Sequence, residues 1–368
     1  MEYGMNRETL LQLIDLARWA PSGDNSQPWR FSVMGDQHLR VHGHDTRDHV
    51  LYDYQGRASH IAHGALLETL RIAASHFGLA ASWTVQHDAE ARAPVYDVFF
   101  SAAAGAETDP LFPYIEKRVV QRRPMRTTTL TSAQRAAILE AAGDGLRSHF
   151  FESFSDRMKV ASLLWRNAGI RLTCKEAYPV HRDVIEWRAR FSEERIPEQA
   201  VGVDPLTARL MQWVMQSWER VHFFNRYLMG TVVPRVELDF LPAVFCGGHL
   251  LLRPVHSPVS LEDWLQLGMR LQRVWLTVAK EGLHLQPELT PVIFRWYARD
   301  NCHFSADPAL FDQALRLSRD FEDLARCGPD EPFFFFCRIG VSSVPSSRSL
   351  RRPGERLMQR ATAGDPIG

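Results

Sequence analysis

The pattern of hydrophobic and polar positions predicts alternating helices and short strands in the first hundred or so residues. Apolar residues at helical spacing predict a helix over 7–19, which Pro21 and the polar turn after it terminate. A second helix is expected over 59–77, because Gly78 stands where a C-cap glycine would. Apolar runs bounded by turn residues predict four strands, around 29–33, 39–42, 83–86 and 95–101.

After residue 109 the pattern becomes mainly helical. Helical spacing of apolar residues covers four segments, 111–120, 132–142, 156–229 and 260–281. The run 241–252 is apolar and interrupted by glycines, and 333–341 reads as a strand. The tail after Val344 is polar and basic, and we expect its last residues to be loose. This mixture of helices and strands predicts an α+β fold.

One stretch of the chain repeats. Residues 64–79 align without gaps with residues 268–283, and each segment is a helix that ends in Gly-Leu. The identical pairs are Gly64 and Gly268, Leu67 and Leu271, Gly78 and Gly282, and Leu79 and Leu283. A duplication explains this alignment, and so do two unrelated helices that share a C-cap glycine. A duplication predicts that the two helices pack together as the central core. The residues expected to be buried there, against each other or close by, are Leu67, Leu70, Leu271 and Val274.

Composition excludes several classes of partner. Lys plus Arg and Asp plus Glu are equal at 43 each, so no general positive charge favours nucleic acid or an anionic membrane. The N-terminal residues do not form a signal peptide pattern, and the longest apolar runs are too short to span a bilayer. Five cysteines without a CxxC pair indicate free, buried thiols in a reducing compartment. We therefore expect a cytoplasmic protein.

The strongest candidate for chemistry is the turn after the first helix, in the run RWAPSGDNSQPWRF at residues 18–31. Its backbone NH groups and the side chains of Ser22, Asn25 and Gln27 could hold the polar edge of a flat ligand. An ordinary helix–turn–strand junction has the same composition, and composition alone favours that interpretation.

The run APSGDNSQPWRF, Ala20–Phe31, closely resembles the signature of the nitroreductase family, A-P-S-x-x-N-x-Q-P-W-x-F. The match is specific because every defined position of the signature is present at its fixed spacing. In that family the turn packs against FMN, and its Ser and Asn contact the flavin from the partner subunit of a dimer. The residues that the resemblance implies as FMN-binding are Pro21, Ser22, Gly23, Asn25 and Gln27.

A second family element is a basic R-x-S-x-R run that holds the FMN phosphate and ribityl chain. The run RVVQR, Arg118–Arg122, resembles it. On the helix expected here, Arg118 and Arg122 would project from one face and clamp a phosphate. Val120 replaces the family's Ser, so that hydrogen bond to the cofactor has no donor here. The alternative is a solvated basic face that continues into Arg123 and Arg126.

Two further elements are weaker. Gly282–Pro287 resembles the family's Gly-Leu-then-Pro passage beside the flavin ring, with the usual acidic neighbour missing or shifted to Glu288. Arg351 and Arg352 resemble the basic residues near the C-terminus that reach the phosphate. By this resemblance Pro287, Arg351 and Arg352 join the FMN-binding set.

The order of these elements is reversed relative to a simple nitroreductase, where the basic run precedes the A-P-S signature. A second A-P-S turn would fall downstream of Arg122, but the run at 141–146 is AAGDGL. The first half thus keeps the turn that, in the family, contacts the flavin from the partner subunit. The second half keeps the basic residues that hold the phosphate. This resembles the duplicated, single-chain nitroreductase-like proteins of the Acg-like and MoeY-like groups. It implies a nitroreductase fold, an antiparallel or mixed central sheet flanked by helices, as an internally duplicated pseudo-dimer.

The resemblance also implies a division of the chain. We expect a first half over 1–108, a second half over 109–345 with a helical insertion at about 156–229, and a basic tail over 346–368. One complete flavin site would then form within a monomer. A homodimer would use another surface and would not be needed for flavin binding.

The implied function is an FMN-dependent oxidoreductase. It would take two electrons from NAD(P)H, a transient donor, and pass them to a nitroaromatic, a quinone or a similar small-molecule acceptor. The flavin ring carries the hydride step, so we name no catalytic side chain. One alternative is an FMN-binding protein without turnover, which sequesters the flavin beneath a lid formed by 156–229. Another is a flavin-dependent biosynthetic enzyme with a dedicated substrate.

Two other patterns in the sequence would suit a metal or a nucleic acid. An H-x-H spacing that could suit a metal lies in a loop of His and Asp residues, at His42, His44, His49, Asp45 and Asp48. No HExxH-type glutamate follows, so we expect no metal and a local pairing of Asp45 with Arg47. The Trp- and Arg-rich segment 181–227 could stack on nucleic acid, but its interleaved glutamates favour a charge-laced helical lid.

Overall fold

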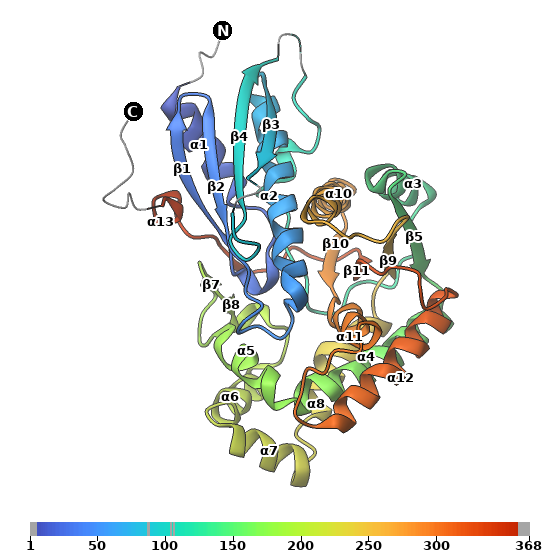
Figure 1. The fold of residues 1–368 in the computed structure, drawn as a ribbon. Helices are drawn as coiled ribbons and strands as arrows, with labels where there is room; N and C mark the ends of the chain where they lie inside the picture. Colours follow the sequence, from blue (N-terminus) through green and yellow to red (C-terminus); the bar gives the residue numbers. More distant parts are fainter. Residues whose placement is uncertain (1–5, 87–88, 104, 106, 360–368) are drawn as a thin grey trace.

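The computed structural model describes residues 6–86, 89–103, 105 and 107–359. Its strands form two four-stranded antiparallel sheets with helices around and between them (Figure 1). The first sheet has the order β1-β2-β4-β3. Its strands are β1 (Trp29–Gly35), β2 (His38–Gly43), β3 (Leu79–Val85) and β4 (Val95–Ala102). The predicted α+β class is confirmed.

The second sheet has the order β10-β11-β9-β5. Its strands are β5 (Leu146–Phe151), β9 (Gly248–Pro254), β10 (His284–Pro287) and β11 (Phe335–Gly340). Counted from the β5 edge, the strands follow one another as first, second, fourth and third in the chain, which is also the order of the first sheet. In each half one long helix connects the second strand to the third. The two sheets therefore share one topology.

The two connecting helices are α2 (Arg57–His76) and α10 (Leu261–Lys280), which are 20 residues long each and pack against each other between the sheets (Figure 1). Each is followed by a glycine with positive φ, 67° at Gly78 and 72° at Gly282. Glycine adopts this conformation without strain and ends the helix before the next strand begins. The repeat of 64–79 at 268–283 thus corresponds to equivalent structure.

The contact between α2 and α10 is a reciprocal approach of backbones. A Cβ atom on Gly64 would lie 2.1 Å from the carbonyl oxygen of Leu265, and one on Gly268 would lie 2.2 Å from that of Ile61. In the alignment Gly64 corresponds to Gly268 and Ile61 to Leu265, so the two contacts are equivalent. A pseudo-two-fold axis between the helices produces this reciprocity, as an isologous contact does in a dimer.

The four residues expected to be buried there are buried, but not against one another. Leu67 and Leu70 lie in the core of the first sheet, and Leu271 and Val274 lie in the core of the second. The expected burial of all four is therefore confirmed, with each pair in the core of its own sheet. The helices approach each other at glycine, and Leu265 of α10 joins the core of the first sheet while Ile61 of α2 joins that of the second. Between the helices Gln272 donates a hydrogen bond to Thr69 Oγ1 at 2.9 Å.

The remaining helices of the second half surround its sheet. They are α3 (Ser132–Ala142), α4 (Phe154–Thr173), α11 (Thr290–Arg299) and α12 (Pro308–Ala325). A segment of short elements separates α4 from β9 (Figure 1). In order these are α5 (Tyr178–Asp183), β6 (Ile185–Glu186), β7 (Phe191–Ser192), β8 (Ile196–Pro197), α6 (Pro205–Val214), α7 (Trp218–Tyr227), α8 (Val232–Pro234) and α9 (Leu241–Val244).

The expectation of a helical region throughout 156–229 was wrong in its middle part. Three two-residue strands, β6, β7 and β8, replace the helix there. Pro197, Gly202 and Pro205 explain the interruption, since proline and glycine break a helical pattern. We call residues 175–240, from the end of α4 to α9, the insertion.

The described part of the C-terminal tail is tied to the rest of the chain. The strand β12 (Arg348–Ser349) pairs with β7 of the insertion, and Met358, just after α13 (Gly354–Leu357), bridges to Phe31 of the first sheet. The last residues of the tail, which we expected to be loose, lie outside the described residues from 360 onward. The division of the chain at residues 109 and 346 stays a prediction.

Two further expectations concern the cysteines and the membrane. All five thiols are free, with Cys174, Cys246 and Cys337 buried and Cys302 and Cys327 partly buried. Among the described residues, no helix has the length and apolar character needed to cross a membrane.

Candidate functional site

A cavity of about 700 Å³ lies where the first half, the second half and the insertion meet. This volume is within the range of small-molecule and cofactor sites. Most of the residues predicted to bind FMN line it, namely Pro21, Ser22, Gly23, Asn25, Arg118, Arg122, Pro287 and Arg351. The chain thus brings the A-P-S turn, the basic run and the C-terminal arginines to one wall.

The A-P-S turn is a strained loop that hydrogen bonds hold in place. After α1 (Arg7–Ala17), Asp24, Asn25 and Gln27 have positive φ values of 50°, 63° and 50°. Such values are uncommon for residues other than glycine and are found at ligand sites. Ser22 Oγ accepts a hydrogen bond from the Gln27 NH at 3.0 Å. Asn25 donates to the Glu193 carbonyl at 3.0 Å, while its buried Oδ1 has no partner among the described residues.

Gln27 and Arg352 lie behind this wall rather than on it. Gln27 is fully buried, and its amide donates to the carbonyls of Asn25 and Glu193 at 3.0 and 2.9 Å. Its Oε1 accepts from the Arg352 backbone NH at 2.8 Å, whereas the Arg352 guanidinium pairs with Glu194 at 3.2 Å. These two residues connect the turn to the tail and the insertion, so we assign them a positioning role.

The basic run is extended, so the predicted clamp of two arginines on one helical face is wrong. A single 3-10 turn, Phe112–Tyr114, replaces the helix expected over 111–120, and Val120 forms a parallel bridge with Leu285 of β10. The β-branched Val119 and Val120 favour this extended conformation beside a sheet edge. Arg118 and Arg122 nevertheless both reach the cavity.

Arg118 belongs to a cluster of cations with Arg351, which is also buried, and Arg348, which is partly buried. Each donates to a backbone carbonyl: Arg118 to Trp19 at 2.9 Å, Arg348 to Glu116 at 2.9 Å and Arg351 to Ala20 at 3.3 Å. None of the three forms an ion pair with a carboxylate in the part of the chain described. Arg348 was not among the predicted residues, although in the run R-S-L-R-R it stands three residues before Arg351.

Burial and mutual repulsion perturb this cluster. Burial and the charges of Arg351 and Arg348 lower the pKa of Arg118 well below its ordinary value. Burial and the charges of Arg348 and Arg18 lower the pKa of Arg351 to about 9. Buried like charges without a counter-ion cost free energy, which a bound anion would offset. The cluster is therefore a candidate site for a phosphate.

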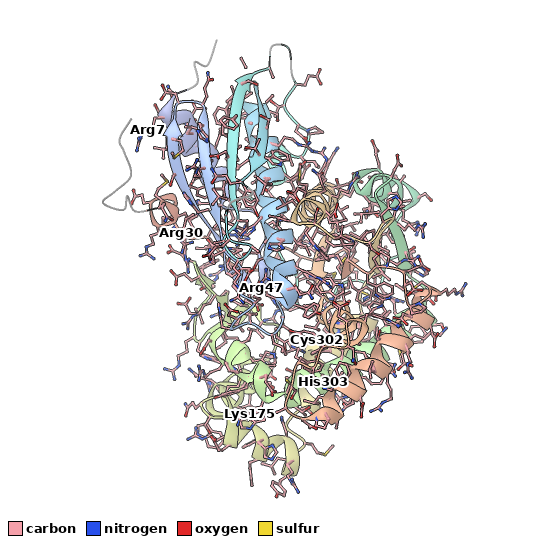
Figure 2. The ribbon with its side chains drawn as sticks, in the orientation of Figure 1. Arg7, Arg30, Arg47, Lys175, Cys302 and His303 are labelled. Carbon is pink, nitrogen blue, oxygen red and sulfur yellow. The ribbon has the colours of Figure 1, made fainter. Side chains whose placement is uncertain are left out.

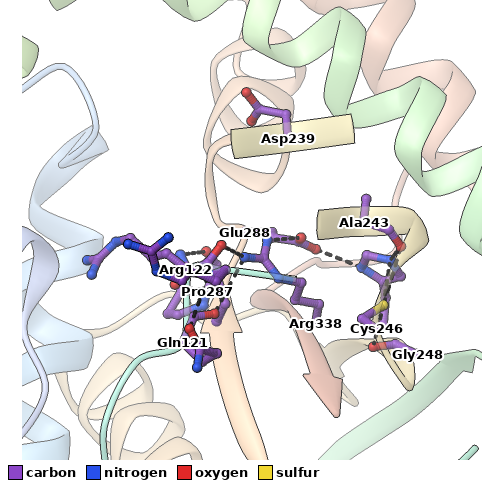
Figure 3. Close-up of polar contacts among 12 residues, drawn as sticks. Gln121, Arg122, Asp239, Ala243, Cys246, Gly248, Pro287, Glu288 and Arg338 are labelled. Atoms are coloured by element: carbon purple, nitrogen blue, oxygen red, sulfur yellow. Dashed lines mark hydrogen bonds and ion pairs between the residues drawn. The ribbon is translucent and has the colours of Figure 1, made fainter. Parts of the chain in front are cut away.

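A second polar network fixes the wall around Pro287 (Figure 3). Glu288 accepts from Arg338 Nη1 at 3.0 Å and lies 2.7 Å from His249 Nδ1. Arg338 also donates to the Arg122 carbonyl at 2.6 Å. Burial lowers the pKa of His249, but the charges of Glu288 and Cys246 and the hydrogen bonds to both together outweigh it and raise that pKa to about 10. Glu288, which follows Pro287, is thus held between two cations.

Further polar groups of the cavity, which no sequence pattern identifies, come from the insertion and from the segments around it. A hydrogen bond of 2.7 Å joins Tyr52 Oη and His181 Nε2, and Arg171 pairs with Asp239 at 2.9 Å. Burial and the charge of Arg171 lower the pKa of His181 to about 3, so its ring is neutral near pH 7. Burial raises the pKa of Asp24 despite the nearby Arg122 and Arg171.

The cavity fits FMN by its unsatisfied polar atoms. Buried side-chain atoms without a partner among the described residues include several on the cavity wall, namely Asn25 Oδ1, Arg118 Nε, Gln286 Oε1, Arg338 Nε and Arg348 Nε. Such groups are expected to be satisfied by a ligand or by water. Arginines suit a phosphate, and the amide oxygens of Asn25 and Gln286 suit NH groups on a flat ring.

The histidine loop lies outside this site. None of His42, His44 and His49 is on the cavity wall. Arg47, which lies at the end of the first sheet that faces the insertion (Figure 2), donates to Asp45 at 2.6 Å, as the sequence argument expected.

Comparison with protein families gives one match. The model of the nitroreductase family matches residues 1–56, which contain the whole run Ala20–Phe31. The resemblance inferred from that run is confirmed.

Comparison with curated proteins and solved structures adds distant likenesses. The uncharacterized protein MT1398 of Mycobacterium tuberculosis (strain CDC 1551 / Oshkosh) is 24% identical over 343 residues, 90% of this chain and 46% of that protein. The chain therefore spans about half the length of this relative. A structure of iodotyrosine deiodinase bound to FMN and 3-iodo-L-tyrosine is 12% identical with a TM-score of 0.35, covering 70% of this chain and 100% of that one. A structure of the FMN-dependent nitroreductase NfnB from Mycobacterium smegmatis with NADPH is 11% identical with a TM-score of 0.38, covering 68% and 96%.

Proposed function

We propose that this nitroreductase-like chain binds one FMN in the cavity and is an FMN-dependent oxidoreductase. It takes two electrons from NAD(P)H and passes them to a nitroaromatic, a quinone or a similar acceptor. The observation that carries the proposal is the cluster of Arg118, Arg348 and Arg351, of which Arg118 and Arg351 are buried and Arg348 is partly buried. The cluster lacks a carboxylate partner among the described residues and lines the same cavity as Ser22 and Asn25. A phosphate and a flat polar ring match these two groups of residues.

The roles of the residues follow from this placement. Arg118, Arg348 and Arg351 hold the phosphate, and Arg122 lines the same cavity, with its backbone carbonyl held by Arg338. Ser22, Gly23 and Asn25 meet the polar edge of the ring across a turn that is already strained into shape. Pro287 and Glu288 form the wall next to the ring. When bound, FMN supplies the hydride chemistry, and the chain's own residues position it and exclude water.

The electron donor and the acceptor would use the same cavity in turn, which is ping-pong chemistry. The cavity has one long wall from the insertion and one from the two halves, so a second flat molecule would lie between the two. No side chain is assigned as a proton donor or a base.

A second candidate function is an FMN-binding protein without turnover. It is favoured by one observation, that residues of α5, α6 and α7 cover one side of the cavity. A closed lid would admit neither nicotinamide nor acceptor.

The first prediction separates these two functions. We expect the purified protein to be yellow, with about one FMN per chain, because one set of phosphate contacts and one A-P-S turn face one cavity. Under anaerobic conditions NADPH or NADH should bleach the flavin absorbance, and a quinone should restore it. Two FMN per chain after acid release would contradict the single site. A flavin that neither nicotinamide reduces, although dithionite does, would favour the sequestering function.

The second prediction concerns assembly. The turn and the arginine cluster that form the cavity belong to the same chain, so we expect FMN retention to be independent of any dimer. Light scattering at serial dilution, with FMN fluorescence followed in parallel, measures both. Loss of FMN at the concentration where a dimer dissociates would show that a second subunit completes the site.

A further inference from the structure

Two helices of the insertion place apolar side chains on the cavity, and only α6 also packs on a small core, through Ala208 and Met211. The cavity-lining residues of each helix recur at spacings of three and four, as one face of a helix does. The apolar ones are Leu206, Leu210, Met211 and Val214 on α6, Trp218, Val221 and Phe224 on α7, and Leu228 directly after α7, and the polar ones are Thr207 and Asn225. Ala208 is buried, whereas α7 has no buried residue.

These faces remain accessible although they are apolar. The exposed fraction of Leu206 is 75%, that of Leu210 is 50% and that of Leu228 is 55%. Helices of this length depend on the burial of an apolar face, because propensity alone does not stabilise them in water. A contiguous apolar surface on a cavity wall is typical of a ligand site. An apolar ligand would complete the burial that the protein itself does not provide.

The polar groups of the same cavity come from other elements. The polar cavity residues near Asp24 are Tyr52, His181, Arg171 and Asp239. The helices α6 and α7 contribute mainly apolar side chains. The cavity therefore has a polar region near the A-P-S turn and an apolar region along the two helices. A molecule with a polar ring at one end and an apolar chain at the other would match both.

We propose that the acceptor is a quinone with an apolar tail, whose ring lies in the polar part of the cavity and whose tail lies along α6 and α7. This rests on the proposed function, since it names the acceptor class of the same site. It explains why the insertion presents exposed apolar side chains such as Leu206 and Leu210 to the cavity.

The experiment compares three probes on the FMN-loaded protein. Menadione carries the naphthoquinone ring without a tail, a menaquinone with a two-unit prenyl tail adds the tail, and geraniol carries the two prenyl units without the ring. Dissociation constants come from quenching of tryptophan fluorescence, to which Trp218 on the cavity wall contributes, or from calorimetry for geraniol. We expect the tailed quinone to bind at least roughly tenfold tighter than menadione, and its KM with NADPH to be lower by a similar factor.

A pair of variants locates the tail. Leu210→Gln is expected to remove most of the advantage that the tailed quinone has over menadione. Leu139→Gln is the control, because Leu139 is 48% exposed on α3 and does not line the cavity. Both positions are exposed helical sites, so the two variants should fold equally well.

The outcomes distinguish this inference from the proposed function. A flavin that bleaches with NADPH and is restored by menadione, without preference for the tailed quinone, overturns the inference alone. Equal effects of both variants on both quinones also overturn it. Geraniol that binds as tightly as the tailed quinone would indicate a general lipid site and overturn the assignment to a quinone. A protein that binds no FMN contradicts the proposed function itself.

Discussion

Replacement of Arg118 by methionine is expected to weaken FMN binding by roughly ten- to a hundredfold while leaving the FMN-free protein about as stable as before. A hydrogen bond between a charged group and a phosphate contributes on the order of 1.5–3 kcal/mol, which corresponds to that range. Methionine keeps the aliphatic contact with Trp275, over which the guanidinium lies at 4.6 Å from the ring centroid. FMN titration and thermal unfolding of the FMN-free protein measure the two effects.

In this prediction the affinity for FMN falls while the stability of the FMN-free protein does not. Arg118 is buried beside Arg348 and Arg351 without a carboxylate, so its charge costs folding free energy until an anion binds. An arginine with a purely structural role would behave in the opposite way, with lower stability and unchanged affinity. Arg352→Met is the matched control, because that guanidinium pairs with Glu194 away from the cavity wall and should have little effect on FMN.

The parts of the site that could be predicted from sequence are those encoded locally. The A-P-S turn is a continuous run in which each residue type has a fixed position, so Ser22 and Asn25 were found without a structure. The conformation of Arg118–Arg122 was not, because a short segment with apolar periodicity fits a helix or an edge strand equally well. The bridge from Val120 to β10, a strand more than a hundred and fifty residues away in the chain, accompanies the extended conformation. Long-range pairing of this kind overrides local propensity.

The polar residues of the cavity show what could not be predicted from the sequence. Tyr52, Arg171, His181 and Asp239 share one cavity but no spacing in the sequence, so no pattern could have grouped them. The same holds for the His249–Glu288–Arg338 network, whose members lie on different strands or just after one. For the fold, by contrast, a short sequence repeat was enough to predict that two helices are equivalent. Two helices with the same glycines identified the pseudo-symmetric pair, although not the direction in which their leucines point.

That pair gives the last prediction. Alanine at Gly64 or at Gly268 is expected to destabilise the protein by about 1–3 kcal/mol or more, the range for overpacking of a close-packed interior. The new Cβ atom would lie 2.1 or 2.2 Å from a backbone carbonyl oxygen, and a backbone cannot rotate away as a side chain can. In an unconstrained helix the same change would stabilise by about 0.5–1 kcal/mol, so the sign of the effect is diagnostic. Gly328→Ala, where nothing lies within 4 Å of the added atom, is the control.

The two substitutions should have similar effects on stability, and both should also weaken FMN binding. Because the contacts are reciprocal, Gly64→Ala and Gly268→Ala are expected to lower the thermal midpoint by similar amounts. Each would push α2 away from α10, and α2 belongs to the half that carries Ser22 and Asn25, while α10 leads into Pro287. The walls of the cavity would then separate, and FMN affinity would fall together with stability. A large effect at one glycine and none at the other would contradict the pseudo-two-fold packing, and unchanged FMN affinity in a destabilised variant would show that the two halves do not set the width of the cavity.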